Sequence, residues 1–227
     1  MIKEKEQQLF SEWKCEREYS SFIADGILNE KIWNEQSLKI TFVLKEANWI
    51  NGNVDLCEFL LSEPKGSYWK TWNNIARWSK ALLDGGEYPQ YVSKKDKTYW
   101  LSKVSFLNLK KVGGDSQAEN RDIKNYAIMD AKFIYRQLCL YQPDIIICCG
   151  RGKGKNADIL YNYILPPENL SPWQTPINGF NYFYTKFDGK EKNTPVISFY
   201  HPQRVAGHDV FKRWYEDMRE MKNILIG

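Results

Sequence analysis

The side chains best suited to chemistry in this chain stand just after short hydrophobic segments. Six of them form the candidate set: Glu46, Asn48, Asn108, Lys110, His201 and Arg204. An imidazole can donate a hydrogen bond, an amide donates and accepts at once, and a carboxylate or amide oxygen can position water. If these residues meet in space, they could bind a polar ligand and direct water to it.

The hydrophobic segments before these residues are typical of buried strands. They are ITFVLKEANW (40–49), VSFLNLKK (104–111), DIIICCGRGKG (144–154) and PVISFYHPQR (195–204). Such strands, separated by helical stretches, predict a parallel sheet with helices on both faces. Ligands of these sheets bind outside the carboxyl ends of the strands, near a topological switch point. We therefore expect the six residues to gather at one mouth.

The predicted fold class is α/β, a three-layer α/β/α sandwich with a mostly parallel four-stranded central sheet. Hydrophobic spacing predicts helices over 3–23, 29–36, 67–86, 122–141 and 208–224. GFNYFYTKF and TPVISFY are two strand candidates on either side of the turn DGKEKN. The length of 227 residues fits one large domain. We expect residues 1–37 to form an N-terminal helical extension and residues 38–227 to form the α/β domain.

The composition permits a polyanionic partner without requiring one. The net charge is +4 and the sequence pI is about 8.6. The 9 Trp, 14 Tyr and 11 Phe could stack on bases, although core packing explains most of them. Basic residues near the strand ends would suit phosphate contacts, and scattered charges on a solvated surface are the alternative. They are Lys103, Lys110, Lys111, Arg121, Lys124, Arg151, Lys153, Lys155 and Arg204.

The cysteines and the hydropathy pattern indicate in which cellular compartment we expect the protein. The five cysteines form no CxxC pair, and the N-terminus MIKEKEQQ does not have the pattern of a signal peptide. No apolar run approaches the roughly 18 residues that span a bilayer. We expect a cytoplasmic protein, a monomer, with no membrane contact.

The glycine-bearing loop of residues 150–155 resembles a phosphate loop only in part. It lacks the Gly-Lys-Ser/Thr of a Walker motif, and Lys155 stands where G-x-G-x-x-G needs its last glycine. A strand-to-helix loop with exposed amides could still hold a phosphate, either of DNA or of a mononucleotide.

Taken in order, four motifs resemble those of the uracil-DNA glycosylase superfamily, closest to the branch whose first motif is GEAPG. The segment ITFVLKEANW resembles that strand and motif, and VSFLNLKK resembles the strand ending in TNVVKC. Residues 119–150 are similar to the loop, helix and strand that follow. SFYHPQRV (198–205) is similar to the HPS or HPA motif. The resemblance covers residues 38 to 225 and implies that DNA is the partner, single- or double-stranded.

Two departures from the family pattern affect the chemistry. The GEAPG branch holds an iron–sulfur cluster, but Lys111 and Ala127 or Ala131 replace two of its cysteines. We therefore expect no cluster, and no metal or other cofactor. In the first motif, one alignment frame puts Ala47 at the water-activating position and the other puts Asn48 there.

The resemblance implies hydrolysis of the N-glycosidic bond of a flipped uracil or other deaminated base. His201 would stabilise the departing base, Asn48 or Glu46 would position water, and Asn108 would read the base. Tyr68 or Trp69 would stack on that base. The DNA contacts would come from Lys110, Arg121, Arg151, Lys153, Arg204 and Val205.

Each of these roles has a structural alternative. His201 could be a packed strand-end histidine, Asn108 could begin a turn, and Glu46 could pair with a nearby lysine. Two further functions also stay open. One is a nucleic-acid or nucleotide-binding module of the same fold without catalysis, and the other is a nucleotide-binding protein that uses 150–155.

Overall fold

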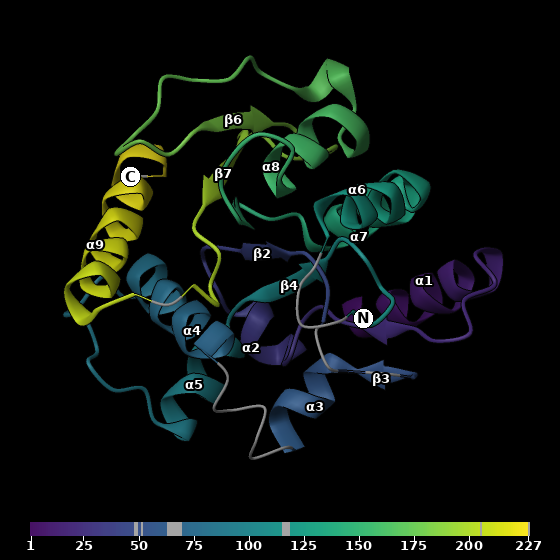
Figure 1. Ribbon diagram of the computed structural model, residues 1–227, viewed down its shortest axis with the longest axis horizontal. Helices are drawn as coiled ribbons and strands as arrows, with labels where there is room; N and C mark the ends of the chain where they lie inside the picture. Colours follow the sequence, from purple (N-terminus) through teal and green to yellow (C-terminus); the bar gives the residue numbers. More distant parts are fainter. Residues whose placement is uncertain (48–49, 51, 63–69, 115–118, 205, 227) are drawn as a thin grey trace.

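The main sheet of the protein has five strands. The structure is a computed structural model that describes residues 1–47, 50, 52–62, 70–114, 119–204 and 206–226. The strands lie in the order β4-β2-β5-β7-β6 (Figure 1). Their bounds are Ile40–Leu44 for β2, Ser105–Asn108 for β4, Ile145–Cys149 for β5, Tyr182–Thr185 for β6 and Thr194–Phe199 for β7.

The sheet has one more strand than the four that the sequence predicts. β4, β2, β5 and β7 are parallel, as expected. β6 adds to the edge of β7 in antiparallel orientation, with Tyr182 opposite Ile197 and Thr185 opposite Thr194. The prediction of a four-stranded sheet was wrong because the short connection between these strands closes a hairpin. Gly189, with φ of 79°, lies in that connection.

Helices α3, α4, α5 and α9 cover one face of the sheet. Their bounds are Leu56–Ser62, Lys70–Leu83, Lys94–Leu101 and His208–Leu225. Trp72 and Trp78 of α4 meet Phe106 of β4 and Phe199 of β7 edge-on, with centroids 5.1 and 5.0 Å apart. These aromatics belong to a continuous hydrophobic cluster that joins the four helices to this face.

Helices α1, α6, α7 and α8 pack against the opposite face. They span Ile2–Glu16, Asn120–Met129, Ala131–Tyr141 and Asn156–Ile159. Val43, Leu107 and Ile146 of the sheet share a second cluster with Trp13 of α1 and Phe133 of α7. The strands β2, β4, β5 and β7 are buried along their whole length, as their unbroken hydrophobic runs require.

Residues 1–37, expected as a helical extension, contribute to this second cluster. Trp13 is completely buried and stacks on Phe133 with centroids 5.2 Å apart. α1 ends at Glu16 instead of continuing to residue 23, and Glu18 has a left-handed φ of 51°. The chain then forms β1 (Ile23–Ala24), which pairs in parallel with β3 (Val54–Asp55) in a separate two-stranded sheet.

The helix expected over 122–141 is divided into α6 and α7. Asp130, with φ of −103° and ψ of 8°, separates them. Its buried carboxylate accepts a hydrogen bond from Tyr19 Oη at 2.8 Å and pairs with Arg17 at 3.1 Å. The break is therefore tied to the segment that follows α1. The remaining short elements are α2 (Glu30–Asn34), the π-helical turn η2 (Leu160–Ile164) and the 3₁₀ turn η3 (Pro167–Asn169).

The strand order creates a switch point between β2 and β5. The chain leaves β2 toward β4 on one side and leaves β5 toward β7 on the other. Parallel sheets bind ligands in the crevice outside the carboxyl ends of the strands at such a point. Within the described residues, none of the helices combines the length and apolarity that crossing a membrane would require.

Candidate functional site

Three strand ends meet at the switch point, through Lys45 after β2, Gly150 after β5 and His201 after β7. A Cβ built on Gly150 would lie 3.9 Å from both His201 Cδ2 and Lys45 Cε. Gly150 has φ of 117°, a conformation that L side chains rarely adopt. The buried Asn156 joins β2 and β5, because its Nδ2 donates to the carbonyls of Val43 and Cys149, both at 3.0 Å. The three strand ends thus lie close together at the place where the crevice of a parallel sheet is expected.

His201 is held as a neutral hydrogen-bond donor in this crevice. Burial, followed by the charges of Lys45 and Lys155, lowers the pKa of His201 from 6.5 to about 4. The backbone N–H of Gln203 donates to His201 Nδ1 at 3.3 Å. Because a backbone amide can only donate, Nδ1 must carry the lone pair and the proton must lie on Nε2. The ring can then donate from Nε2 to a ligand.

Neither of the two lysines beside His201 forms an ion pair with a carboxylate among the described residues, although the charge of Glu46 also acts on Lys45. Lys45 Nζ donates to the neutral amide oxygen of Asn120 at 3.0 Å. Burial and the charge of Lys155 together lower the pKa of Lys45. Two mutually repelling cations next to a neutral donor favour a negatively charged or strongly polar ligand.

Glu46, a candidate for positioning water, is bound to a lysine instead. Its carboxylate pairs with Lys110 Nζ at 2.9 Å, and only 3% of the Glu46 side chain is exposed. Lys110 also pairs with Asp122 at 2.7 Å. Gly114 packs so closely that a Cβ there would overlap the Glu46 carboxylate. This is the structural alternative for Glu46, and the same contacts occupy Lys110, a candidate for DNA binding.

Asn108, the candidate for base reading, donates to a buried aspartate. Asp25 Oδ2 accepts from the Asn108 backbone N–H at 2.6 Å and from its Nδ2 at 3.0 Å. Asn108 is 2% exposed, and its Oδ1 has no hydrogen-bond partner among the described residues. The donor of the amide is therefore in use, whereas the acceptor is not.

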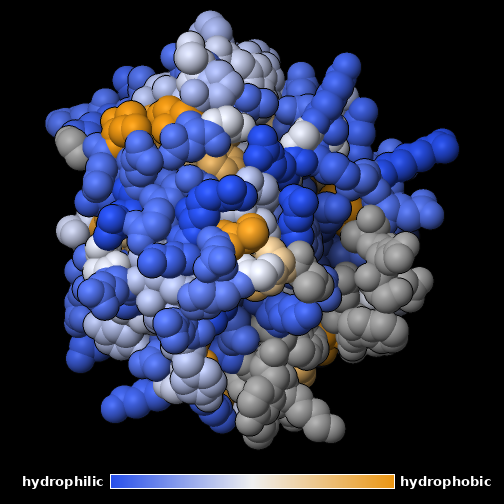
Figure 2. Space-filling model, turned by 60° about the vertical axis from the view of Figure 1, so that its left-hand side comes forward, coloured by the Kyte–Doolittle hydropathy of each residue, from blue (hydrophilic) through white to orange (hydrophobic). Residues whose placement is uncertain are grey.

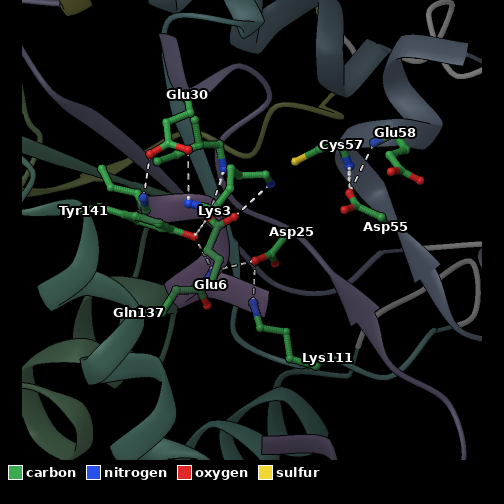
Figure 3. A network of polar contacts seen from close by, with 12 residues as sticks. Lys3, Glu6, Asp25, Glu30, Asp55, Cys57, Glu58, Lys111, Gln137 and Tyr141 are labelled. Carbon is green, nitrogen blue, oxygen red and sulfur yellow. Dashed lines mark hydrogen bonds and ion pairs between the residues drawn. The ribbon is translucent and has the colours of Figure 1, made fainter. Parts of the chain in front are cut away.

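The aspartate belongs to a buried polar network that the sequence does not reveal (Figure 3). Asp25 Oδ1 accepts from Lys111 Nζ at 2.6 Å and from Gln137 Nε2 at 2.8 Å. Gln137 also donates to the hydroxyl of Tyr141, which donates to Glu6 at 2.6 Å. Lys111 and Asp25 are both completely buried. Lys111 therefore serves this ion pair, and its position offers no sulfur ligand.

Two arginines that we expected to contact DNA lie around Tyr200, the residue before His201. Arg151 donates to the Tyr200 hydroxyl at 3.3 Å and to the carbonyl of Gly179 at 2.9 Å. The Arg204 guanidinium carbon lies 5.7 Å from the centroid of the Tyr200 ring. Both arginines are exposed, so they present positive charge beside the crevice.

The other predicted residues are less closely tied to the crevice. Lys153 is exposed in the glycine loop, and Arg121 is exposed at the start of α6. The Gly154 N–H, an amide that could have met a phosphate, donates to Asp158 at 2.6 Å. Four of the predicted residues lie outside the described part of the chain, namely Asn48, Tyr68, Trp69 and Val205.

The surface of the protein is mostly hydrophilic on one side (Figure 2), and its possible metal-binding side chains are scattered among the described residues. On the side that carries α9, hydrophilic residues predominate and hydrophobic ones form small separate spots (Figure 2). In the described ranges, no three His, Cys, Asp or Glu residues are grouped to hold a metal ion.

Comparison of the sequence with protein-family models and with curated proteins gives no match. A proposal for the function of the protein therefore rests on the residues around the crevice.

Proposed function

We propose that the protein binds DNA at the crevice between β2 and β5, with an extrahelical base against His201. The observation that carries this proposal is the neutral imidazole, protonated on Nε2, beside Lys45 and Lys155. A neutral donor suits the carbonyl of a pyrimidine, and lysines suit the phosphates on either side of it. The motif resemblance to uracil-DNA glycosylases supports the same ligand and the three-layer fold of that family.

The reaction we propose at this site is hydrolysis of the N-glycosidic bond. Water forms a bond to the anomeric carbon while the bond from that carbon to the base nitrogen breaks, and the electron pair leaves with the base. His201 Nε2–H would stabilise the resulting anion through its carbonyl oxygen. The proton released by the water balances the one that the base then takes up. With Glu46 paired to Lys110, we assign the positioning of water to Asn48.

A second candidate is DNA binding without hydrolysis, and specific contacts favour it. Asp25 holds the Asn108 amide and Lys110 holds the Glu46 carboxylate. Two of the three groups expected to read the base and activate water are thus engaged within the protein. Binding through His201 and the two lysines needs neither of them.

The test combines binding and single-turnover excision on labelled oligonucleotides that contain uracil, hypoxanthine, xanthine or hydroxymethyluracil, single- and double-stranded. We expect the double substitution K45Q/K155Q to weaken binding and to reduce the slope of log K against log salt by about 1 to 2. K132Q/R136Q removes the same charge from α7, where both side chains are exposed and ion-paired, and should leave the slope unchanged.

The outcomes separate the two candidates. Excision of one base that is lost in His201→Ala would establish hydrolysis. Retained binding without excision across the panel would support the binding module. If K45Q/K155Q binds DNA with the affinity and salt slope of the original protein, the crevice is not the DNA site.

A further inference from the structure

A single peptide unit connects His201 to the helix α4. The unit joins Pro202 to Gln203. Its carbonyl accepts a hydrogen bond from Asn74 Nδ2 at 2.6 Å, and its N–H donates to His201 Nδ1 at 3.3 Å. The carbonyl and the N–H point in opposite directions within one rigid plane. The orientation of this plane therefore determines whether Nδ1 of His201 receives a donor.

The local chain favours that orientation, because the flipped peptide would give Gln203 a positive φ, but it leaves the flipped form as the alternative. Arg204 N–H donates to the His201 carbonyl at 3.1 Å, which closes a four-residue turn with Pro202 in its second position. Proline at this position is compatible with type I and type II turns, and these differ by a flip of the central peptide. Gln203 does not have a positive φ, so the turn is not type II. A flipped peptide would withdraw its N–H from His201.

Asn74 is itself held in one orientation. It is 2% exposed, and its Oδ1 accepts from Arg77 Nη1 at 3.2 Å. Because a guanidinium can only donate, the amide oxygen must face Arg77 and the amide nitrogen must face Pro202. Arg77 also donates to the carbonyls of Pro89 and Gln90, at 3.2 and 3.0 Å. The Asn74 donor is thus aimed at the turn by Arg77, one helical turn further along α4, and by the contacts that hold Arg77.

We propose that Asn74 is a positioning residue that sets the tautomer of His201 through the Pro202–Gln203 peptide. This inference rests on the proposed function, since it concerns the hydrogen that His201 offers to a ligand. With Asn74 in place, the peptide N–H meets Nδ1 and the imidazole proton stays on Nε2. Without it, the peptide can turn, Nδ1 can take the proton, and Nε2 becomes an acceptor that repels a carbonyl oxygen.

The experiment reads the tautomer directly by ¹⁵N NMR of the imidazole rings. The chain has only two histidines, so the exposed His208 is an internal reference. We expect the Nε2–H form of His201 in the original protein at neutral pH. In Asn74→Leu and Asn74→Asp, neither of which donates to Pro202, the tautomer ratio should fall about tenfold, the effect of one lost hydrogen bond.

Ser79→Ala is the matched control. Ser79 is a fully buried residue of the same helix whose hydroxyl donates to the Ile75 carbonyl, away from the turn. It should leave the His201 tautomer unchanged. An Nδ1–H form in the original protein, or an unchanged Nε2–H form in both folded Asn74 variants, would overturn the proposal. If Asn74→Leu does not fold, Asn74→Asp tests the proposal, because aspartate has the size of asparagine and keeps the contact with Arg77.

Different measurements test the proposed function and this inference, so either one can be refuted without the other. A DNA affinity that His201→Ala leaves unchanged would remove the functional role of His201 but would not alter its NMR tautomer. Conversely, an unchanged tautomer in the Asn74 variants would leave the DNA-binding result standing.

Discussion

His201 should make the protein selectively sensitive to mild acid. In the folded chain, burial and the charges of Lys45 and Lys155 lower the pKa of the imidazole from 6.5 to about 4. Between these two values the unfolded chain binds a proton that the folded chain does not. The free energy of unfolding therefore falls as the pH falls through this window, and the full contribution is present only above it.

The size of the effect follows from the two pKa values. Their separation corresponds to about 3 kcal/mol when the window has been crossed completely. Between pH 7 and pH 5, His201 should lower the free energy of unfolding by about 2 kcal/mol. His201→Gln keeps a neutral donor and removes the titration, so its unfolding free energy should depend less on pH by that amount.

The assay is urea unfolding at a series of pH values between 7 and 5, for the original protein and His201→Gln. Taking the difference between the two proteins removes the contribution of the carboxylates that titrate in both. His208→Gln replaces the other histidine, which is exposed, and controls for the loss of an imidazole. Parallel pH profiles for the original protein and His201→Gln would refute the lowered pKa, and with it the reason for a neutral donor in the crevice.

Four other substitutions test the ion pairs beside the site and the packing of the core. Asp25→Leu should cost about 3–5 kcal/mol in urea unfolding because Lys111 would stay buried without a partner. Adding Lys111→Met should recover only part of that loss, because the donors of Asn108 and Gln137 would still lack the Asp25 acceptor. A Cβ at Gly114 would overlap the Glu46 carboxylate, so Gly114→Ala should break the ion pair of Glu46 with Lys110 and lower the free energy of unfolding by about 1–3 kcal/mol. An unchanged Tm would contradict this. Trp13→Ala should cost about 3–5 kcal/mol in the same urea assay, and a loss below about 1 kcal/mol would show that α1 is not part of the core.

The strands and the position of the crevice could be predicted because their signals are local. Five-residue hydrophobic runs such as Ile40–Leu44 and Ile145–Cys149 identify buried parallel strands without further information. The residue after such a run must lie at the carboxyl end of the sheet. This reasoning brings His201 and the loop after β5 together, and the structure confirms that they meet at Gly150.

The partners of the candidate residues could not be predicted because they are distant in the sequence. Asp25 is 83 residues from Asn108, and Asn74 is 128 residues from Pro202. A buried ion pair such as Asp25–Lys111 has no periodic pattern, and a lysine after a strand is equally typical of an exposed loop. The pairing of Glu46 with a lysine was one of two alternatives, and only the fold selects Lys110.

The contacts of Asn108 also indicate which ligand could draw it into the crevice. If its side chain turned away, Asp25 would still accept from the Asn108 backbone, Lys111 and Gln137, so no donor or acceptor of the network would be stranded. The cost is one hydrogen bond to a charged group, about 1.5–3 kcal/mol. Two hydrogen bonds to a base edge, at about 0.5–1.5 kcal/mol each, return about 1–3 kcal/mol, so the exchange is close to balanced. Because Asn108 Oδ1 has no partner now, a ligand that uses both the donor and the acceptor, as the uracil edge does, gains a bond that the free protein lacks. A ligand that only accepts gains nothing over Asp25, and the network would hold Asn108 where it is.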